Sequence, residues 1–336
     1  MKTVMPELYA DPFQERTKAL TRGPLQLLGG RFRFESNSDQ LLRLVDVAYA
    51  GLPGHRLSTD VPDLRVGLVL IPRESGRSRS EPASLEMFSG VGRVGGATGS
   101  SNVVTVSPEG RAALVVVSDG MLRFPYHTRY ELIEFAVFTL AARAQGLISL
   151  HAACVGSGGR GLLLMGPSGS GKSTVALQCL LEGLDFVSED STFVAPDSLL
   201  ITGVPNFLHV RSDSLRWVKQ ARTVTAMRAC PVIRRRSGVR KFEVDLRGGG
   251  HRLATSPQQL SAVVFLSARP AAAGRLLRPL SKRELTARLT ANQAYAAGQP
   301  GWAAFCRSVS LAGGFELRRG RHPLEAVDAL RELLNR

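Results

Sequence analysis

The chain has 336 residues, enough for two domains or for one large domain with an appendage, and its hydrophobic content of 44% is that of ordinary globular proteins. No apolar run is long and uninterrupted enough to span a bilayer, and the N-terminus lacks the apolar stretch of a secretion signal, so the sequence predicts a cytoplasmic protein with no membrane partner. The formal net charge of +15 comes largely from scattered arginines without a nucleic-acid-binding motif, which favours an acidic or phosphorylated partner over nucleic acid.

Residues 1–146 are interpreted as a smaller α+β domain that carries no chemical motif. Its first 28 residues or so predict an extended lead-in, and the Arg- and Ser-rich stretch 75–84 predicts a mobile loop. The glycine-rich stretch 90–101 has no lysine in a P-loop position, so we interpret it as a loop or hairpin and not as a second nucleotide site. The first of two predicted helices is capped by Asn37 or Ser38. The predicted strands lie at 31–35, 66–71, 103–106, 112–117 and 122–124, and the predicted helices at 39–49 and 129–145.

Residues 147–336 are interpreted as a larger α/β domain, which begins with a strand at 148–155, a glycine turn and a strand at 161–165. These two strands predict a hairpin. The four cysteines are scattered without a C-x-x-C pair and predict buried, reduced thiols and not a metal site. They are Cys154, Cys179, Cys230 and Cys306. The further predicted strands lie at 184–188, 192–195, 199–203, 207–210 and 260–266, and the helices at 175–182, 213–218 and 323–334.

The stretch that follows the strand at 161–165 matches the P-loop pattern G-x-x-x-x-G-K-S and runs into a predicted helix. Its glycines let backbone N–H groups turn inward around phosphate oxygens, and the helix N-terminus adds the positive end of its dipole. Lys172 is expected to reach the β- and γ-phosphates, and the Ser173 hydroxyl to ligate Mg²⁺. The sequence therefore predicts a nucleoside triphosphate site. Its residues are Gly166, Pro167, Ser168, Gly169, Ser170, Gly171, Lys172, Ser173 and Thr174.

Two carboxylates, Glu189 and Asp190, follow the next predicted strand. In an α/β sheet this position is the carboxyl edge, beside the phosphate site. Phosphoryl transfer to an alcohol needs a carboxylate that holds Mg²⁺ and one that accepts the proton of the attacking hydroxyl. Either residue could be that proton acceptor, and Glu189 is the candidate metal ligand together with Ser173. His151, on the first strand of the hairpin, could reach the same edge and tune the acid.

Other nucleotide-binding classes lack their required residues in this chain. No L-S-G-G-Q signature follows the P-loop, as an ABC-type ATPase would need, and no N-K-x-D sequence is present to read a guanine base.

The segments around His151, the P-loop and the acidic pair resemble the catalytic domain of bacterial HPr kinase/phosphorylase. The resemblance covers residues 148–210, and Lys172 follows His151 by 21 residues, as in that family. It implies a P-loop kinase domain of the HPr kinase and phosphoenolpyruvate carboxykinase type. It also implies a serine kinase that depends on ATP and Mg²⁺ and that forms a homo-oligomer. Relatives of this family phosphorylate precursor peptides. The family has Asp-Asp where this chain has Glu189-Asp190, so the identity of the base stays open.

The basic segment 234–252 offers further phosphate contacts. Lys241 is the first candidate and Arg240 the second, although a solvated basic loop is an equal alternative. Trp217 and Trp302 are interpreted as packing residues. The expected function is a kinase that transfers the γ-phosphate of ATP to a Ser or Thr hydroxyl of a peptide or small protein. A small-molecule kinase on the same scaffold and a non-catalytic ATP-sensing protein are the alternatives.

Overall fold

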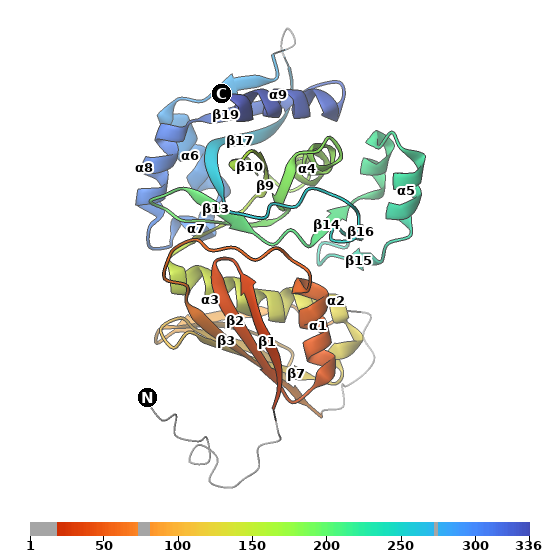
Figure 1. Ribbon diagram of the computed structural model, residues 1–336, viewed down its shortest axis with the longest axis vertical. Helices are drawn as coiled ribbons and strands as arrows, with labels where there is room; N and C mark the ends of the chain where they lie inside the picture. The colour runs from red at the N-terminus through yellow and green to blue at the C-terminus, as the bar shows by residue number, and fades with distance from the viewer. Residues whose placement is uncertain (1–18, 73–80, 272–274) are drawn as a thin grey trace.

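The computed structural model describes residues 19–72, 81–271 and 275–336, which form a mixed α/β structure with several sheets. Figure 1 shows two modules, the first in red to yellow below and the second in green to blue above. Most of the expected lead-in at 1–28, and residues 75–80 of the expected loop at 75–84, lie outside the described residues. No helix in the described part of the chain is long and apolar enough to cross a bilayer.

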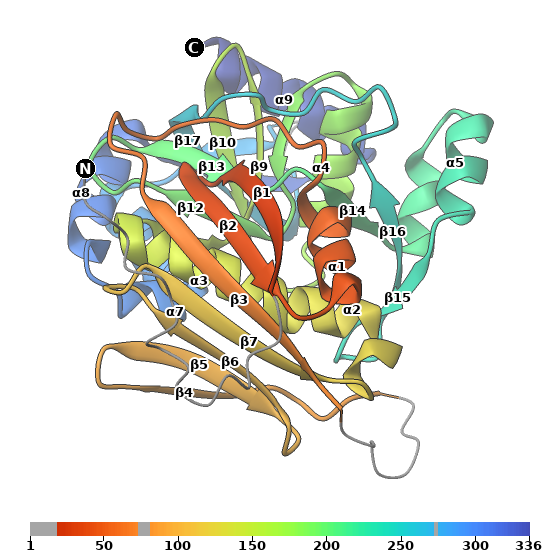
Figure 2. The same cartoon turned by 60° about the horizontal axis from the view of Figure 1, so that its bottom comes forward.

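The first module is a seven-stranded sheet with helices packed on one face (Figure 2). Burial alternates along its second strand: Phe32 and Phe34 point into the core, whereas Arg31 and Arg33 point to solvent. The core continues into helices α1 (Asp39–Tyr49) and α3 (Glu134–Gln145). In spatial order the strands are β1 (Leu20–Leu27), β2 (Gly30–Ser36), β3 (Asp63–Ile71), β7 (Ala112–Ser118), β6 (Asn102–Ser107), β5 (Arg93–Thr98) and β4 (Glu86–Gly90).

Most predicted elements of this module are confirmed. The stretch 90–101, interpreted as a loop or hairpin, contains strand β5 and the turns that join it to β4 on one side and to β6 on the other. The strand predicted at 122–124 is wrong: this segment is the 3₁₀ turn η2 (Met121–Arg123). Its backbone makes tight turn bonds, from Leu122 N–H to Asp119 and from Phe124 N–H to Met121. Pro125 then starts the helical run α2 (Pro125–His127), η3 (Thr128–Ile133) and α3, in which η3 is a π-helical turn.

The second module is organised by a nine-stranded sheet in which the central strand β10 (Arg160–Met165) is buried on both faces. β10 pairs antiparallel with β9 (Ala153–Ser157), which confirms the predicted hairpin, and parallel with β17 (Gln258–Pro270). The remaining strands are β11 (Asp185–Ser188), β12 (Ser191–Val194), β13 (Leu200–Gly203), β8 (Ile148–His151), β18 (Leu277–Pro279) and β19 (Gly314–Arg319).

The single strand predicted at 148–155 is wrong, because the chain changes neighbours at Ala152. β8 pairs with β12, whereas β9 pairs with β10 and β11. This exchange matters for the site, since it places His151 opposite Ser191, directly after the acidic pair.

Helices cover both faces of this sheet (Figure 1). Leu162 and Leu164 of β10 pack into the core formed with α4 (Lys172–Leu181) and α9 (Pro323–Asn335). Leu163 and Met165 pack into the opposite core with α6 (Lys282–Asn292) and α8 (Trp302–Ala312), beside the short helix α7 (Ala294–Ala297). The described cysteines are free; Cys230 is only partly buried, against the expectation, and the other three are buried.

A small third sheet lies beside α4 and completes the wall of the site. It consists of β14 (Phe207–Val210), β16 (Arg240–Asp245) and β15 (Val232–Arg234). The helix expected at 213–218 is the 3₁₀ turn η4 (Ser212–Trp217), and α5 (Ala221–Arg228) follows it.

The two modules are packed together, and their cores are not separate. Phe193 of β12 and Val204 belong to the core of the first module, and the Phe193 ring lies 5.4 Å from that of Phe138. The Asn206 side chain donates a 2.9 Å hydrogen bond to the carbonyl of Ala48. The domain boundary at 146 therefore stays a prediction.

Candidate functional site

The P-loop joins the end of β10 to the start of α4 and has the backbone that its glycines predict. Gly166 has φ +147° and Gly171, the residue before α4, has φ +98°, both values that residues with a Cβ rarely adopt. A Cβ on Gly166 would also lie 2.7 Å from the Ser170 Oγ. The loop can therefore turn closely enough for its N–H groups to face one concave surface.

The Lys172 side chain folds back over the loop from the first turn of α4. Its ammonium donates a 2.7 Å hydrogen bond to the carbonyl of Gly166 and lies 3.4 Å from that of Pro167. Burial lowers the pKa of Lys172, and the negative charges of Asp190 and Glu189 partly oppose that shift.

Glu189 is buried behind the P-loop, where it connects α4 with β14. The Ser173 hydroxyl donates a 2.8 Å hydrogen bond to Oε1 of Glu189. Oε2 accepts a 2.9 Å bond from the backbone N–H of His209 and lies 2.6 Å from Nδ1 of its ring. Burial alone would raise the pKa of Glu189, but the charge and hydrogen bond of His209 lower it below its usual value. The carboxylate therefore stays ionised beside Ser173.

A chain of buried charges continues from His209 into the first module. Nε2 of His209 lies 3.1 Å from Oε1 of Glu243, so both ring nitrogens face carboxylates, and these carboxylates raise the His209 pKa although burial opposes the shift. Glu243 in turn pairs with Arg129, whose Nε lies 3.2 Å from Glu134. These side chains are at most 10% exposed, so their charges are compensated mainly by one another and not by bulk solvent.

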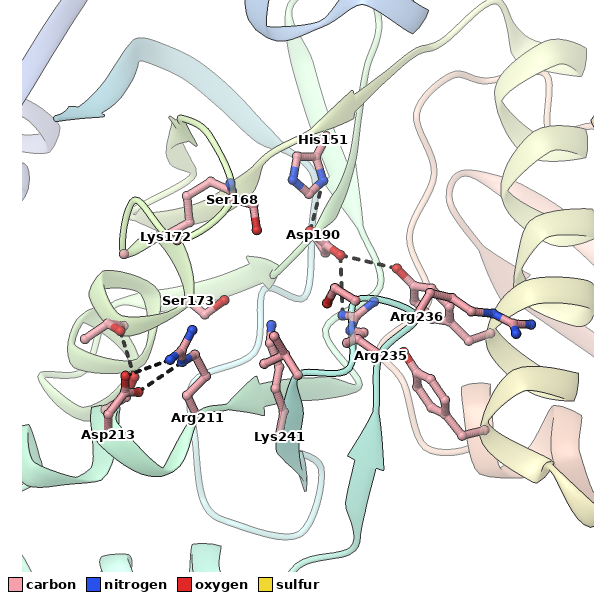
Figure 3. A pocket seen from close by; sticks show the side chains of 18 of the residues that line it. His151, Ser168, Lys172, Ser173, Asp190, Arg211, Asp213, Arg235, Arg236 and Lys241 are labelled. Carbon is pink, nitrogen blue, oxygen red and sulfur yellow. Dashed lines mark hydrogen bonds and ion pairs between the residues drawn. The ribbon is translucent and has the colours of Figure 1, made fainter. Parts of the chain in front are cut away.

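Asp190 faces the open side of the P-loop, and Figure 3 shows His151 and Arg235 directed at it. His151 Nδ1 lies 3.0 Å from Oδ1, and Tyr130 donates a 3.2 Å hydrogen bond to Oδ2. Arg235 lies 3.5 Å from the same Oδ2. Burial alone would raise the pKa of Asp190, but the hydrogen bond and charge of His151, with Arg235 and Lys241, hold it well below its usual range. Asp190 is therefore an ionised carboxylate next to the P-loop.

One cavity of about 600 Å³ brings these groups together. Outside the P-loop it is lined by Tyr126, Tyr130, Glu131, His151, Asp190, Arg211, Asp213, Ser214, Arg216, Trp217, Arg235, Arg236, Ser237, Val239 and Lys241. The P-loop itself contributes Ser168, Gly169, Gly171, Lys172, Ser173 and Thr174.

The cavity does not include every residue that the sequence suggested. Arg240 is exposed on β16 and does not line the cavity, whereas Lys241, one residue later, points inward and lies 3.8 Å from Oε1 of Glu189. Strand alternation separates the two. Both tryptophans were expected to be packing residues. Trp302 packs against Phe305, whereas Trp217 packs against His322 and also lines the cavity.

Three residues of the site, His209, Glu243 and Tyr130, were not predicted from the sequence, whereas Arg235 lies in the basic segment 234–252 that was. Glu243 was the easiest to find, because it lies two residues after Lys241 and therefore shares its face of the strand. His209 stands in an apolar strand, a position where a lone polar residue signals a buried partner. Nothing near Tyr130 in the sequence connects it with the P-loop.

No family model matches the chain, and no curated protein matches its sequence. Among solved structures, the chain is similar to the HPr(Ser) kinase/phosphatase from Coxiella burnetii at 14% sequence identity and a TM-score of 0.30. The similarity covers 55% of this chain and 94% of that protein. A likeness of this size carries no argument about activity, so the function is inferred from the geometry of the site.

Proposed function

We propose that the chain is a kinase that uses ATP and Mg²⁺ to phosphorylate a Ser or Thr hydroxyl of a peptide or small protein. The observation that carries the proposal is that one cavity holds the Lys172 ammonium, the Ser173 hydroxyl bonded to Glu189, and the ionised Asp190. Phosphate binding, metal binding and proton acceptance are the three tasks of phosphoryl transfer.

In this proposal, the loop backbone and Lys172 bind the phosphates of ATP. The Lys172 ammonium is already buried and hydrogen-bonded to carbonyls of its own loop. Contact with a phosphate therefore exchanges a bond to a neutral carbonyl oxygen for one to a charged oxygen, so that both partners are ionised. Lys241 is the second phosphate contact that we assign.

Ser173 and Glu189 would hold Mg²⁺, and their observed contact fits that role. Among the described residues, no group of three or more His, Cys, Asp or Glu side chains is arranged to hold a metal ion. Mg²⁺ in nucleotide sites does not need such a group, because phosphates and water fill most of its coordination positions beside one or two protein oxygens. Bound Mg²⁺ would neutralise the charge of the phosphates.

Asp190 is the proton acceptor that we assign, because it lines the cavity whereas Glu189 is buried behind Ser173. The acceptor oxygen forms a bond to the γ-phosphorus as the bond to the β–γ bridging oxygen breaks. The hydroxyl proton passes to Asp190, and ADP leaves. His151 and Arg235 hold the carboxylate in place for this transfer.

The test is transfer of radiolabel from γ-labelled ATP, with Mg²⁺, to proteins and peptides of a lysate of the source organism, followed by identification of the labelled residue. We expect a labelled Ser or Thr with the unmodified chain and none with Lys172→Ala. Lys282→Ala, which removes an exposed lysine on α6, is the matched control and should label normally.

Three results would contradict the proposal. Undiminished labelling by Lys172→Ala would exclude a role of the P-loop in transfer. Label on a free metabolite alone would favour a small-molecule kinase. Tight ATP binding without transfer to any acceptor would favour a nucleotide sensor.

A further inference from the structure

Three consecutive residues of the π-helical turn η3, in the first module, bind side chains of the second module. Arg129 pairs with Glu243, Tyr130 donates to Asp190, and Glu131 accepts a 2.7 Å hydrogen bond from Arg236. π-helical turns are rare and frequently occur at functional sites.

The two charged residues of this turn clamp it on either side of Tyr130. The Arg129 side chain is 4% exposed and its guanidinium lies 4.3 Å from the centre of the Phe207 ring. Glu131 receives a second bond from Arg236, at 2.5 Å, and His127 Nδ1 lies 3.0 Å from it. Because both neighbours are fixed to the second module or to the helix, Tyr130 has little freedom to move.

The aromatic ring of Tyr130 is held in place by two neighbouring side chains. It stacks on Tyr126 at 5.4 Å between centroids with an interplanar angle of 14°, and the Arg235 guanidinium lies 4.7 Å from its centroid. Burial, with the charge of Asp190, raises the pKa of Tyr130 well above its usual value. The hydroxyl is therefore a donor throughout the pH range of ordinary assays.

We propose that Tyr130 is a positioning residue for Asp190, so that the first module completes the catalytic site. His151 holds Oδ1 and Tyr130 holds Oδ2, which fixes the plane of the carboxylate toward the cavity. General-base catalysis depends on that geometry, since a displacement of about 1 Å is enough to cost roughly 100-fold in rate. This inference rests on the proposed kinase function. It adds a role for Tyr130, which belongs to the first module and not to the module that contains the P-loop.

The test measures release of inorganic phosphate from Mg·ATP by the full chain, with water as the acceptor. The variants are Tyr130→Phe, Asp190→Asn, the double variant and Lys172→Ala. The matched control is Tyr49→Phe, which removes a buried hydroxyl that has no hydrogen-bond partner in the described structure. Thermal unfolding of each variant identifies any that fails to fold.

We expect Tyr130→Phe to lower kcat about 10-fold, with KM for Mg·ATP within about twofold of the unmodified chain. The double variant should be no slower than Asp190→Asn alone, because Tyr130 acts only through that carboxylate. Tyr49→Phe should retain both constants.

Two results would overturn the positioning role while the proposed function survives. One is an unchanged kcat in Tyr130→Phe, and the other is a rate loss that adds fully to that of Asp190→Asn; in both, Lys172→Ala still abolishes turnover. Equal turnover by the unmodified chain and Lys172→Ala would instead refute the proposed function and remove the basis of the inference. If Tyr130→Phe unfolds, His151→Gln, which loosens the other oxygen of the same carboxylate, must show the same non-additivity with Asp190→Asn.

Discussion

Substitution of Glu189 by glutamine separates the metal-binding role from the proton-accepting role. The Glu189 carboxylate accepts from the Ser173 hydroxyl and from two nitrogens of His209. A glutamine has one oxygen for His209, and its amide N–H would face Ser173. The hydroxyl would then have to accept a hydrogen bond where it now donates, and the negative charge next to His209 and Lys241 would be lost.

The size of the effect follows from these contacts. Hydrogen bonds to a charged group contribute about 1.5–3 kcal/mol and those between neutral groups about 0.5–1.5 kcal/mol. We therefore expect Glu189→Gln to lower the free energy of unfolding by about 1–2 kcal/mol. Loss of a carboxylate that orients or ligates the metal costs roughly 10–100-fold in metal affinity.

Calorimetric titration of ATP, with Mg²⁺ and with EDTA, measures the metal-dependent part of nucleotide binding. Glu189→Gln should lose most of the Mg²⁺ enhancement, while ATP binding in EDTA stays near that of the unmodified chain. Asp190→Asn should show the normal Mg²⁺ enhancement and a kcat about 10²–10⁴-fold lower, the usual contribution of a general base. The reasoning is refuted if Asp190→Asn loses the Mg²⁺ enhancement and Glu189→Gln keeps it.

Three further predictions concern stability and the loop. Arg129→Met removes the guanidinium from two buried carboxylates, Glu134 and Glu243, and leaves Glu243 with His209 alone, so urea denaturation should show a loss of about 3–5 kcal/mol. Burial alone would raise the pKa of Glu243, but His209 and Arg129 lower it, so its stabilisation is full above the unfolded pKa of about 4.3 and is lost as pH falls through the lower folded value. Glu243→Gln should therefore flatten the acid limb of stability against pH. Gly171→Ala, at φ +98°, should cost about 1–3 kcal/mol and weaken ATP binding measured by calorimetry.

The P-loop unit was predictable because its determinants are local in sequence. The strand, the glycine turn and the first turn of α4 are adjacent, so the positions of Lys172 and Ser173 follow from a short segment. The acidic pair was predictable for the same reason, since it directly follows the next strand of the same sheet.

Other elements depend on partners that the sequence does not identify. The break at Ala152 arises because β8 and β9 pair with different strands, which no local pattern indicates. Helix α6 has a capping box from Ser281 to Glu284, but only Leu285 and Leu289 on it are buried, so its apolar periodicity is weak. Helix α8 follows Gly301, which has a left-handed backbone and offers no side-chain cap.

The buried charge chain argues that the first module serves the site and not only the stability of the fold. Arg129, Glu243, His209 and Glu189 lie in series between η3 and Ser173. Buried ion pairs contribute little net stability, because desolvation offsets their attraction, and apolar residues of similar volume often replace them without loss. Such a chain does fix the orientation of its members, because each charge is constrained by the next. The last member of the chain is the Glu189 carboxylate beside Ser173. Through this chain the first module therefore fixes the orientation of the carboxylate that would ligate the proposed metal.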